Sequence, residues 1–204
     1  MTKHSLRDIK REATANALAE AAFELARERG LDGFVVEDVV QRAGYSRRTF
    51  ANHFSCKEEA VAAAAVTFKA IDEAEELIAN LPESASPLDI LHQLMKMQLT
   101  AELLRRMREL VAFSKRHPTL EPYVLSLFRG LQSDAQEIMR ELSRGRYPEE
   151  YIHLLVGALY GAVLPLLDGS LNVILPGQPS AEHPGATTFE HYLDTIFGYL
   201  RNGF

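Results

Sequence analysis

The sequence has little of what several classes of protein require. Its 204 residues include one cysteine, Cys56, so no disulfide can form within the chain and a disulfide-framed secreted domain is excluded. No apolar run reaches the length of about eighteen residues that a membrane span needs. The first residues do not combine a basic segment, an apolar run and a small-residue cleavage site. We therefore expect a cytoplasmic protein with no membrane partner.

Motifs for catalysis and metal binding are also missing. The sequence has no glycine-rich phosphate loop, no nucleophile elbow and no HExxH pair. Glu150 and His153 have the Glu-x-x-His spacing of di-iron bundles, but such sites need two copies and two further glutamates. We expect no catalytic residue, no metal site and no cofactor. An all-helical enzyme or metal-binding bundle with a basic head is the alternative.

The residues that are present indicate a globular protein with an uneven charge. Hydrophobic residues make up 47% of the chain and charged residues 25%. Residues 1–57 hold ten Lys or Arg against eight Asp or Glu, a net charge of +2, whereas the remaining 147 residues hold 12 against 20, a net charge of −8. A mildly basic N-terminal part on an acidic remainder is typical of a DNA-binding protein with a separate second function.

Helical spacing of apolar residues runs along almost the whole chain, which predicts an all-α fold. A first helix should extend from a cap at Ser5 to Arg29. Two short helices, 36–43 and 47–54, should follow on either side of Gly44. Helices of about eight residues are not stable alone, so both must pack on the first helix.

The rest of the chain predicts longer helices. A fourth helix should begin near Ser55 or Cys56, where Ser55 and Glu58 have capping-box spacing, and run to Asn80. Residues 173–186, rich in Pro and Gly, predict a surface loop. The further predicted helices span residues 88–104, 105–116, 119–144, 148–172 and 187–202.

The stretch VEDVVQRAGYSRRTFANHFSCK, residues 36–57, has the pattern of a helix-turn-helix. Val39 and its apolar neighbours form a stripe on the first short helix, and Gly44 permits the turn. Phe50 and Phe54 recur one helical turn apart and should bury one side of the second helix. The other side then presents guanidinium and amide groups suited to base edges. A solvated basic helix pair in an ordinary bundle is the alternative.

The segment from AAFELARERG (21–30) through VEDVVQRAGYSRRTFANHF to CKEEAV (56–61) resembles the TetR family of transcriptional regulators. The resemblance covers about a quarter of the chain and implies a three-helix DNA-binding domain over residues 1–56. It implies a helical ligand-binding and dimerisation domain over residues 57–204. Carried over by position, the resemblance assigns Arg47, Arg48 and Asn52 to base edges, with Ser46 in the same DNA-binding set, and Tyr45, Thr49, His53 and Lys57 to phosphates.

Three positions depart from the family pattern. Val35 stands where Thr usually caps the second helix, and Cys56 stands where Ser or Asn usually caps the fourth. Ala51 replaces an aromatic residue that contacts the groove. An alanine can still touch a thymine methyl, and paired arginines suit guanine. The operator sequence therefore cannot be inferred from relatives.

Adaptable apolar side chains on the later helices could line a cavity for a hydrophobic or amphipathic effector, which the resemblance implies. The expected lining residues are Met95, Leu99, Leu103, Met107, Tyr123, Leu127 and Phe128. A basic group over residues 105–116 either binds an anionic ligand or forms a solvated face paired with Glu102 and Glu109.

The helix near residues 152–167 is apolar nearly all round, so it should be covered on two sides. The resemblance implies that it and the last helix meet their two-fold copies in a homodimer; closure of the monomer core is the alternative. The expected interface residues are Gly157, Tyr160, Gly161, Leu164, Phe189, Tyr192, Leu193 and Ile196. The whole sequence thus predicts a homodimeric repressor that binds a palindromic operator on double-stranded DNA and is released by a small-molecule effector.

Overall fold

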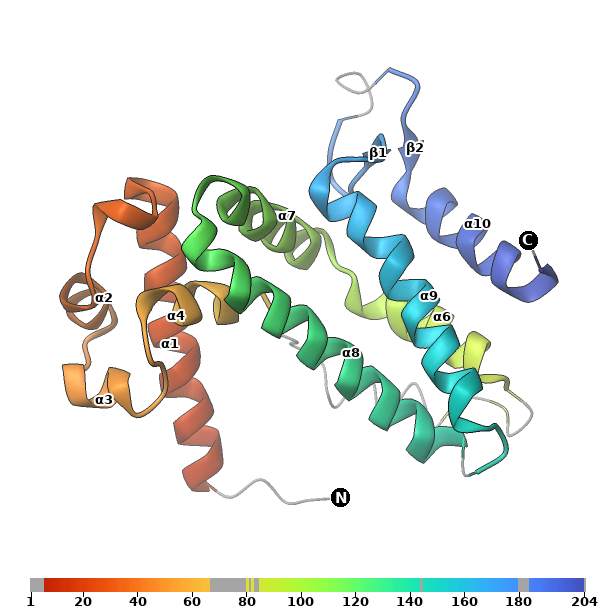
Figure 1. The fold of residues 1–204 in the computed structure, drawn as a ribbon, viewed down its shortest axis with the longest axis horizontal. Coiled ribbons are helices and arrows are strands. Elements are labelled where there is room, and N and C mark those ends of the chain that lie inside the picture. Colours follow the sequence, from red (N-terminus) through yellow and green to blue (C-terminus); the bar gives the residue numbers. More distant parts are fainter. Residues whose placement is uncertain are drawn as a thin grey trace. The chain divides into compact units, whose positions relative to one another are not determined.

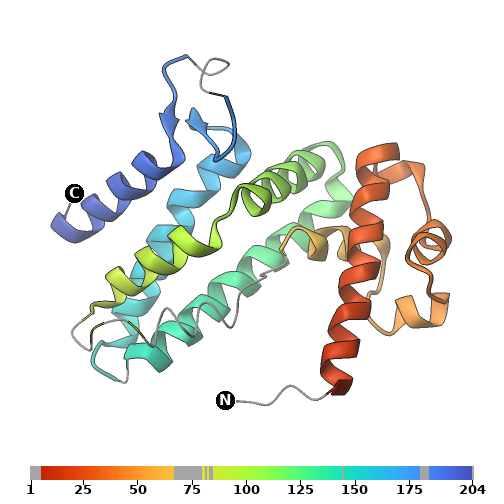
Figure 2. The same cartoon turned by 180° about the vertical axis from the view of Figure 1, so that it is seen from behind.

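The structure is a computed structural model that describes residues 6–66, 80, 82, 85–143, 145–179 and 184–203 (Figures 1 and 2). The chain divides into two compact units. We call residues 1–67 and 109–127 the head unit, and residues 68–108 and 128–204 the body unit. Each unit is described by itself below.

The head unit is built on one long helix. Its elements are α1 (Leu6–Arg29), η1 (Leu31–Gly33), α2 (Val36–Ala43), α3 (Arg47–Ala51), α4 (Lys57–Ala64), the end of α7 (Ala101–Arg116), η2 (Pro118–Leu120) and the start of α8 (Glu121–Ser143). α2 and α4 pack on α1. Leu18, Ala22 and Phe23 of α1 are almost completely buried, and the Phe23 ring meets the edge of Phe113 at a centroid distance of 6.0 Å. Apolar burial on α1 therefore stabilises helices that are too short to be stable alone.

The predicted helix boundaries in the head unit are mostly correct. α1 ends at Arg29 and α2 spans 36–43 as predicted, while the Ser5 cap lies outside the described residues. α3 is shorter than predicted and ends at Ala51, although Phe54 still donates its backbone N–H to the Phe50 carbonyl at 2.9 Å.

Of the two starts predicted for the fourth helix, Ser55 and Cys56, the structure has Cys56. Cys56 is the N-cap of α4, and its Sγ accepts the Glu59 backbone N–H at 3.4 Å. The Glu59 carboxylate accepts the N–H and the hydroxyl of Ser55, both at 2.6 Å. The Cys56 sulfur takes the place of the usual hydroxyl but is a weak hydrogen-bond acceptor. The Glu59 carboxylate is a stronger acceptor, and its hydrogen bonds to Ser55 add to the cap. Of the predicted continuation to Asn80, residues 67–79 lie outside the described residues.

The body unit contains α6 (Pro87–Gln98), the start of α7, most of α8, α9 (Glu149–Asp168), β1 (Val173–Ile174), β2 (Thr187–Thr188) and α10 (Phe189–Asn202). α6 packs on α10, where the His92 ring stacks on Phe197 at a centroid distance of 4.2 Å. The Arg108 guanidinium donates to the carbonyl of Leu166 near the end of α9, at 2.8 Å from Nη2. Burial lowers the pKa of Arg108.

Three boundary predictions in the body unit are corrected by the structure. The break expected at residues 104 and 105 lies at Leu99 and Thr100, because Thr100 Oγ1 accepts the Leu103 backbone N–H at 3.3 Å and starts α7. α9 ends at Asp168 rather than residue 172, since Gly169 adopts a left-handed conformation with φ of 80°. The predicted loop 173–186 begins with β1, which pairs in parallel with β2.

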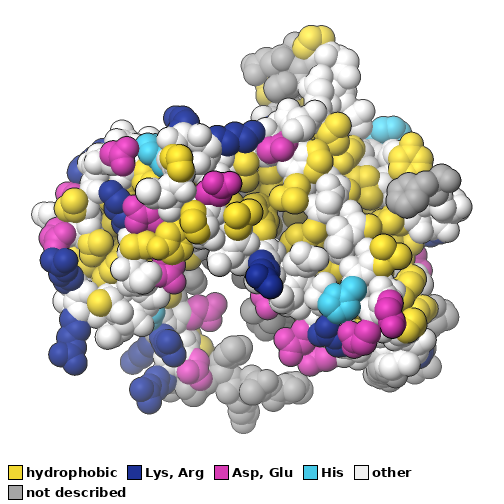
Figure 3. All heavy atoms as spheres, in the orientation of Figure 1, with side chains coloured by type: hydrophobic (Ala, Val, Ile, Leu, Met, Phe, Trp, Pro, Cys, Tyr) yellow, Lys and Arg dark blue, Asp and Glu magenta, His cyan; other side chains and the backbone are white. Residues whose placement is uncertain are grey.

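α9 is the most apolar element. It is 20 residues long, and its most apolar stretch of 18 residues has a mean hydropathy of 1.5 and is 33% buried. By length and composition alone, this helix could cross a membrane. Its inner side is buried at Leu155, Val156 and Leu159, so in this structure it is a packed helix. Its outer side leaves Leu154 73% exposed and Leu164 43% exposed. Figure 3 shows hydrophobic side chains gathered over this part of the body unit.

Candidate nucleic-acid interface

The turn between α2 and α3 is set by local signals. Gly44 closes α2 with φ of 73°, a left-handed conformation that glycine adopts at little cost. Tyr45 donates its N–H to the Val40 carbonyl at 2.9 Å. The Ser46 hydroxyl then caps α3 by accepting the Thr49 backbone N–H at 3.0 Å. The direction of α3 is therefore fixed by a glycine and a cap two residues apart.

Aromatic anchors hold one side of α3 in the head core. Phe50 is 3% exposed and Phe54 is 9% exposed, and their rings lie 5.6 Å apart. Val39 of α2 is fully buried. Because the apolar side of α3 is buried, its opposite side is open to solvent, where Arg47, Arg48, Ala51 and Asn52 are all exposed.

The three residues expected at base edges differ in their partners. Arg47 Nη1 pairs with Glu37 Oε1 of α2 at 2.5 Å, and the Arg47 side chain is 77% exposed. Within the part of the chain that the structure describes, Arg48 and Asn52 have no side-chain hydrogen bond or ion pair. The exposed side of α3 thus presents one paired guanidinium, one unpaired guanidinium and one unpaired amide.

The residues expected at phosphates are also placed unequally. Tyr45 is 37% exposed beside the turn, and half-buried His53 lies against the ring of Phe54. The hydroxyls of Ser46 and Thr49 hydrogen-bond to each other at 2.8 Å. These short polar side chains border the exposed side of α3.

Lys57, which the resemblance assigns to a phosphate, has its ammonium group bonded within the head unit. Its Nζ donates to the carbonyls of Leu31 and Phe34 at 2.7 and 2.8 Å. The ammonium also lies 5.0 Å from the centroid of the Phe34 ring, within range of a cation–π interaction. Lys57 therefore ties the start of α4 to the loop between α1 and α2. These carbonyls lie more than twenty residues away, so no local pattern indicated them.

Ion pairs fix α2 on α1. Arg42 donates to both carboxylate oxygens of Glu28, at 2.9 and 2.6 Å, and this lowers the pKa of Glu28. Arg29 pairs with Asp38 at 3.4 Å. Asp38 also accepts the Val35 backbone N–H at 2.9 Å, so α2 has a polar cap although Val35 cannot supply one.

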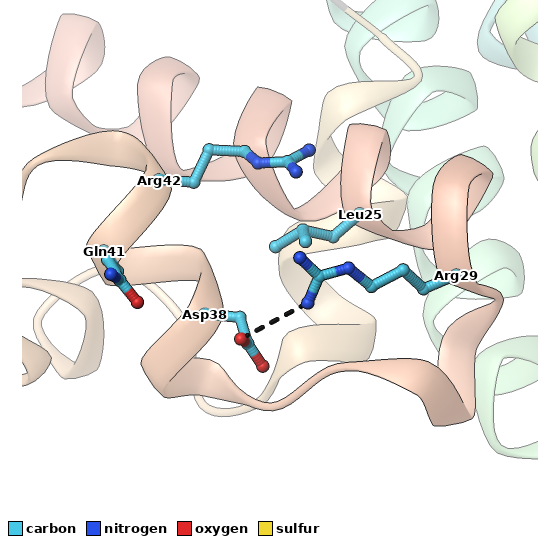
Figure 4. A pocket seen from close by; sticks show the side chains of 5 residues that line it. All are labelled: Leu25, Arg29, Asp38, Gln41 and Arg42. Carbon is cyan, nitrogen blue, oxygen red and sulfur yellow. Dashed lines mark hydrogen bonds and ion pairs between the residues drawn. The ribbon is translucent and has the colours of Figure 1, made fainter.

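A solvent-open hollow of about 260 Å³ lies between α1 and α2. Its lining is Leu25, Arg29, Asp38, Gln41 and Arg42, and Figure 4 shows Arg29 and Asp38 pointing toward each other across it. Of its charged lining residues, Arg29 pairs with Asp38, and Arg42 pairs with Glu28 of α1. It includes none of the seven residues expected to line an effector cavity.

Those seven residues do not all belong to one unit. Leu103 and Met107 are buried in the body unit, and Met95, Leu99 and Phe128 are half-buried there. Tyr123 and Leu127 belong to the head unit. The Tyr123 hydroxyl interacts with the Cys56 side chain, and this raises the pKa of Tyr123. Tyr123 therefore contacts the cap of α4, which no helical spacing could predict.

The basic group on α7 is largely paired. Glu102 accepts hydrogen bonds from Arg105 and Arg106, each at 2.7 Å, which holds the pKa of Glu102 at about 2. Glu109, the other expected acidic partner, pairs instead with Arg27 of α1 at 3.3 Å. These contacts favour the interpretation of a solvated, self-paired face over an anion-binding group.

The residues expected at a dimer interface fall into two groups. Phe189 and Leu193 are 4% and 2% exposed, so they belong to the core of the body unit. Tyr192 is half-buried and donates its hydroxyl to the Ala162 carbonyl of α9 at 2.7 Å. Gly157, Tyr160 and Ile196 are also half-buried, and burial raises the pKa of Tyr160.

Only Gly161 and Leu164 of that expected set are exposed. A Cβ added at Gly161 would meet no atom within 4 Å. The expected set does not include Leu154, the most exposed apolar residue of the same stripe, which lies seven residues before Gly161. Helical spacing alone could have found it.

The expected DNA-binding set does not include Glu37, the ion-pair partner of Arg47. This contact joins α2 to α3 across a turn, so helical spacing could not indicate it.

The acidic, histidine and cysteine residues do not gather into a metal site in the described part of the chain. No group of three such side chains is arranged to hold an ion there. His153, expected in the Glu-x-x-His spacing, lies on the surface near Glu149 and Arg140.

Residues 18–64 match the sequence model of the family described as bacterial regulatory proteins, tetR family. Among curated proteins, none is significantly similar to this chain in sequence. The matched segment spans α2, α3 and α4, which are the elements that build the interface described above.

Three solved structures are similar to the whole chain. A putative TetR-family transcriptional regulator from Mesorhizobium loti MAFF303099 is 18% identical, with 92% of this chain and 95% of that one covered and a TM-score of 0.49. A transcriptional regulator from Rhodococcus sp. Rha1 is 24% identical, with 93% and 96% covered and a TM-score of 0.47. A TetR/AcrR-family regulator from Thermobifida fusca YX-ER1 is 21% identical, with 93% and 97% covered and a TM-score of 0.47. Likeness at this level carries no argument about ligands or operators.

Proposed function

We propose that this chain, whose residues 18–64 match the sequence model of the tetR family of bacterial regulatory proteins, is a homodimeric repressor of the TetR family. It binds a palindromic operator on double-stranded DNA. A hydrophobic or amphipathic small molecule binds the body unit and thereby releases the protein from the operator. The protein acts in the cytoplasm, without a catalytic residue or a cofactor.

The observation that carries the DNA-binding proposal is the exposed side of α3. Phe50 and Phe54 are buried on the opposite side of the helix, so Arg48 and Asn52 project into solvent. Gly44 and Ser46 fix the direction of the helix. A guanidinium suits the two acceptors of guanine, and an amide suits adenine. Ser46, Thr49, Tyr45 and His53 are short or planar polar groups at the edges of the same surface, where phosphates of a major groove would lie.

The exposed stripe on α9 supports the dimer. Leu154, Gly161 and Leu164 lie at seven- and three-residue intervals, so they share one side of the helix. An exposed apolar stripe beside a glycine with open space suits close packing against a second helix. A two-fold dimer would also present two α3 helices to half-sites about 34 to 36 Å apart, one helical turn of DNA.

Support for an effector comes from the body unit. Leu103 and Met107 are buried there, and Met95, Leu99 and Phe128 of the same unit are half-buried. Methionine side chains adapt in shape to varied apolar ligands. Release follows if the effector binds more tightly to a body conformation in which the two heads no longer match the half-site spacing.

The first test is an electrophoretic mobility shift with full-length protein. A duplex from upstream of the protein's own gene and a scrambled duplex of the same composition are titrated at low and moderate salt. We expect selective retardation of the upstream duplex and a steep loss of affinity with salt. Equal, weak retardation of both duplexes at every salt concentration would contradict sequence-specific DNA binding.

The effector is tested in the same assay. A panel of apolar and amphipathic metabolites is screened for compounds that raise the melting temperature, and each is added to the protein–DNA complex. An effector should raise the melting temperature and weaken operator binding over the same concentration range. The reason is that its binding stabilises the folded body and is linked to lower operator affinity. Compounds that raise the melting temperature without changing DNA affinity would contradict the release mechanism.

A further inference from the structure

The two adjacent arginines at the start of α3 are in different states. Arg47 is ion-paired with Glu37, whereas Arg48 has no partner among the described residues. Both belong to the exposed side of α3, and both are solvent-accessible. A carboxylate therefore holds one of the two guanidinium groups that face the proposed DNA surface.

Glu37 is positioned to make this contact by the first turn of α2. It is the second residue of the helix, where an acidic side chain is favoured by the helix dipole. The next residue, Asp38, turns toward α1, where it pairs with Arg29. The first turn of α2 thus sends one carboxylate toward α1 and the other toward α3.

The structural need for these two carboxylates is unequal. Asp38 caps the Val35 N–H and helps to fix α2 on α1. α3 already has its own cap at Ser46 and its own anchors at Phe50 and Phe54. The Glu37 side chain is 56% exposed and joins no core residue. Its contact with Arg47 is therefore not required to place α3.

We propose that Glu37 limits DNA affinity by holding Arg47 away from DNA until a base edge with two matched acceptors replaces the carboxylate. This inference rests on the proposed DNA-binding function. On arbitrary DNA, Arg47 can contact only phosphates. Exchanging the Glu37 carboxylate for a phosphate replaces one anion by another, so little free energy is gained. At the operator, a guanine offers two acceptors in fixed geometry, which compensates for the lost ion pair.

The same carboxylate has a second effect on non-specific complexes. An uncompensated Glu37 near the DNA surface would repel phosphates, so the pair must stay closed when no base replaces it. On arbitrary DNA the closed pair costs only the phosphate contact that Arg47 does not make, whereas at the operator the pair must open. Glu37 therefore lowers affinity for the operator at least as much as affinity for arbitrary DNA.

The test uses Glu37→Gln in the full-length protein. An operator duplex is first defined by in vitro selection with the wild-type protein, and a scrambled duplex serves as non-specific DNA. We expect Glu37→Gln to bind the scrambled duplex about two- to fivefold more tightly, the range that an exposed ion pair supports. Operator affinity should rise by at least the same factor, because Arg47 then reaches the base without breaking an ion pair. The salt dependence on the scrambled duplex should steepen by about one phosphate contact.

Glu28→Gln is the matched control, because it removes the same charge from the head unit and breaks an ion pair with Arg42 that does not involve α3. If Glu37→Gln and Glu28→Gln change non-specific affinity alike, the effect is one of net charge and the inference is wrong. An operator affinity of Glu37→Gln that stays at the wild-type value would also overturn it. The variant Glu37→Gln with Arg47→Gln should restore the wild-type salt dependence on scrambled DNA.

Failure of the proposed function gives a different result. If selection with the wild-type protein yields no preferred sequence, DNA recognition itself fails before any variant is compared. If a preferred sequence emerges and Glu37→Gln behaves as wild type on both duplexes, the regulator function stands and the role of Glu37 falls.

Discussion

Among the described residues, the head unit and the body unit each present one side of a helix to solvent, of α3 in the head and of α9 in the body, and the two sides differ in chemistry. The exposed side of α3 is polar and carries Arg48 and Asn52. The exposed side of α9 is apolar and carries Leu154, which is 73% exposed. A polar surface is well solvated without a partner, whereas an apolar stripe gains free energy when it is covered. The exposed side of α9 is therefore where the proposed dimer would gain from a second copy.

The largest expected effect tests the body surface. Gly161→Leu should weaken dimerisation by about 1 to 3 kcal/mol per copy, and the interface contains two copies. The added side chain meets nothing within 4 Å of its Cβ in the monomer, so the monomer should stay folded. Sedimentation should show a lighter species with wild-type helicity by circular dichroism, and operator binding should weaken because one half-site is lost.

Gly130→Leu is the control for that experiment. Gly130 is an exposed helical glycine of α8 that also has open space around it. The two variants gain the same helix propensity and the same exposed side chain. Sedimentation of Gly161→Leu as a dimer, indistinguishable from Gly130→Leu, would place the interface elsewhere.

The second prediction concerns the interior of the head. Lys57→Met should lower the free energy of unfolding by about 1.5 to 3 kcal/mol, the range for hydrogen bonds that involve a charged group. Two carbonyls, of Leu31 and Phe34, lose their donor. Thermal unfolding measures the loss, with Lys10→Met, at an exposed position of α1, as the control for charge.

The same variant distinguishes a structural from a DNA-contacting lysine. A phosphate contact would leave the melting temperature unchanged and reduce the salt dependence of DNA binding by about one contact. A structural tie lowers the melting temperature and leaves the salt dependence of the folded protein unchanged. The first pattern would show that Lys57 exchanges its carbonyl partners for DNA.

Local signals explain why the head could be predicted more closely than the body. Gly44 and Ser46 mark the turn and the cap of α3 within three residues, and Phe50 and Phe54 mark its buried side. These signals act over one or two helical turns, so a sequence displays them directly. The fold class and the exposed side of α3 follow from them.

Contacts between distant residues explain what the sequence left undetermined. Apolar spacing indicates that Leu193 is covered, but it does not distinguish coverage by the same chain from coverage by a second copy. Tyr123 shares the helical spacing of body residues yet contacts Cys56 in the head. Lys57 looks like any basic residue near a helix-turn-helix until its partners at Leu31 and Phe34 are seen.

The third prediction sharpens the polar surface of the head. Arg48→Ala should cost about 1 to 3 kcal/mol at the operator and relax the preference at one base pair, because Arg48 is an unpaired guanidinium on the exposed side of α3. Titration of operator duplexes with single base substitutions measures this. A uniform loss across all substituted duplexes would instead identify Arg48 as a phosphate contact.

The smallest expected effect compares carboxylates by pH. In the body unit, hydrogen bonds from Arg105 and Arg106 hold the pKa of Glu102 at about 2, below its ordinary value of 4.5. A lowered pKa stabilises the folded state above the unfolded pKa, and that stabilisation is lost as the pH falls from about 4.5 toward 2. The Glu102 side chain is 53% exposed, so screening limits the effect to about 0.5 to 1 kcal/mol for the two pairs.

Glu102→Gln should therefore lower the free energy of unfolding at neutral pH by that amount and flatten the loss of stability below pH 4.5. Glu141→Gln, at an exposed position of α8, should do neither. Chemical denaturation at pH 7 and pH 3 measures both. Parallel pH profiles for the two variants would show that the pairs on α7 do not stabilise the body.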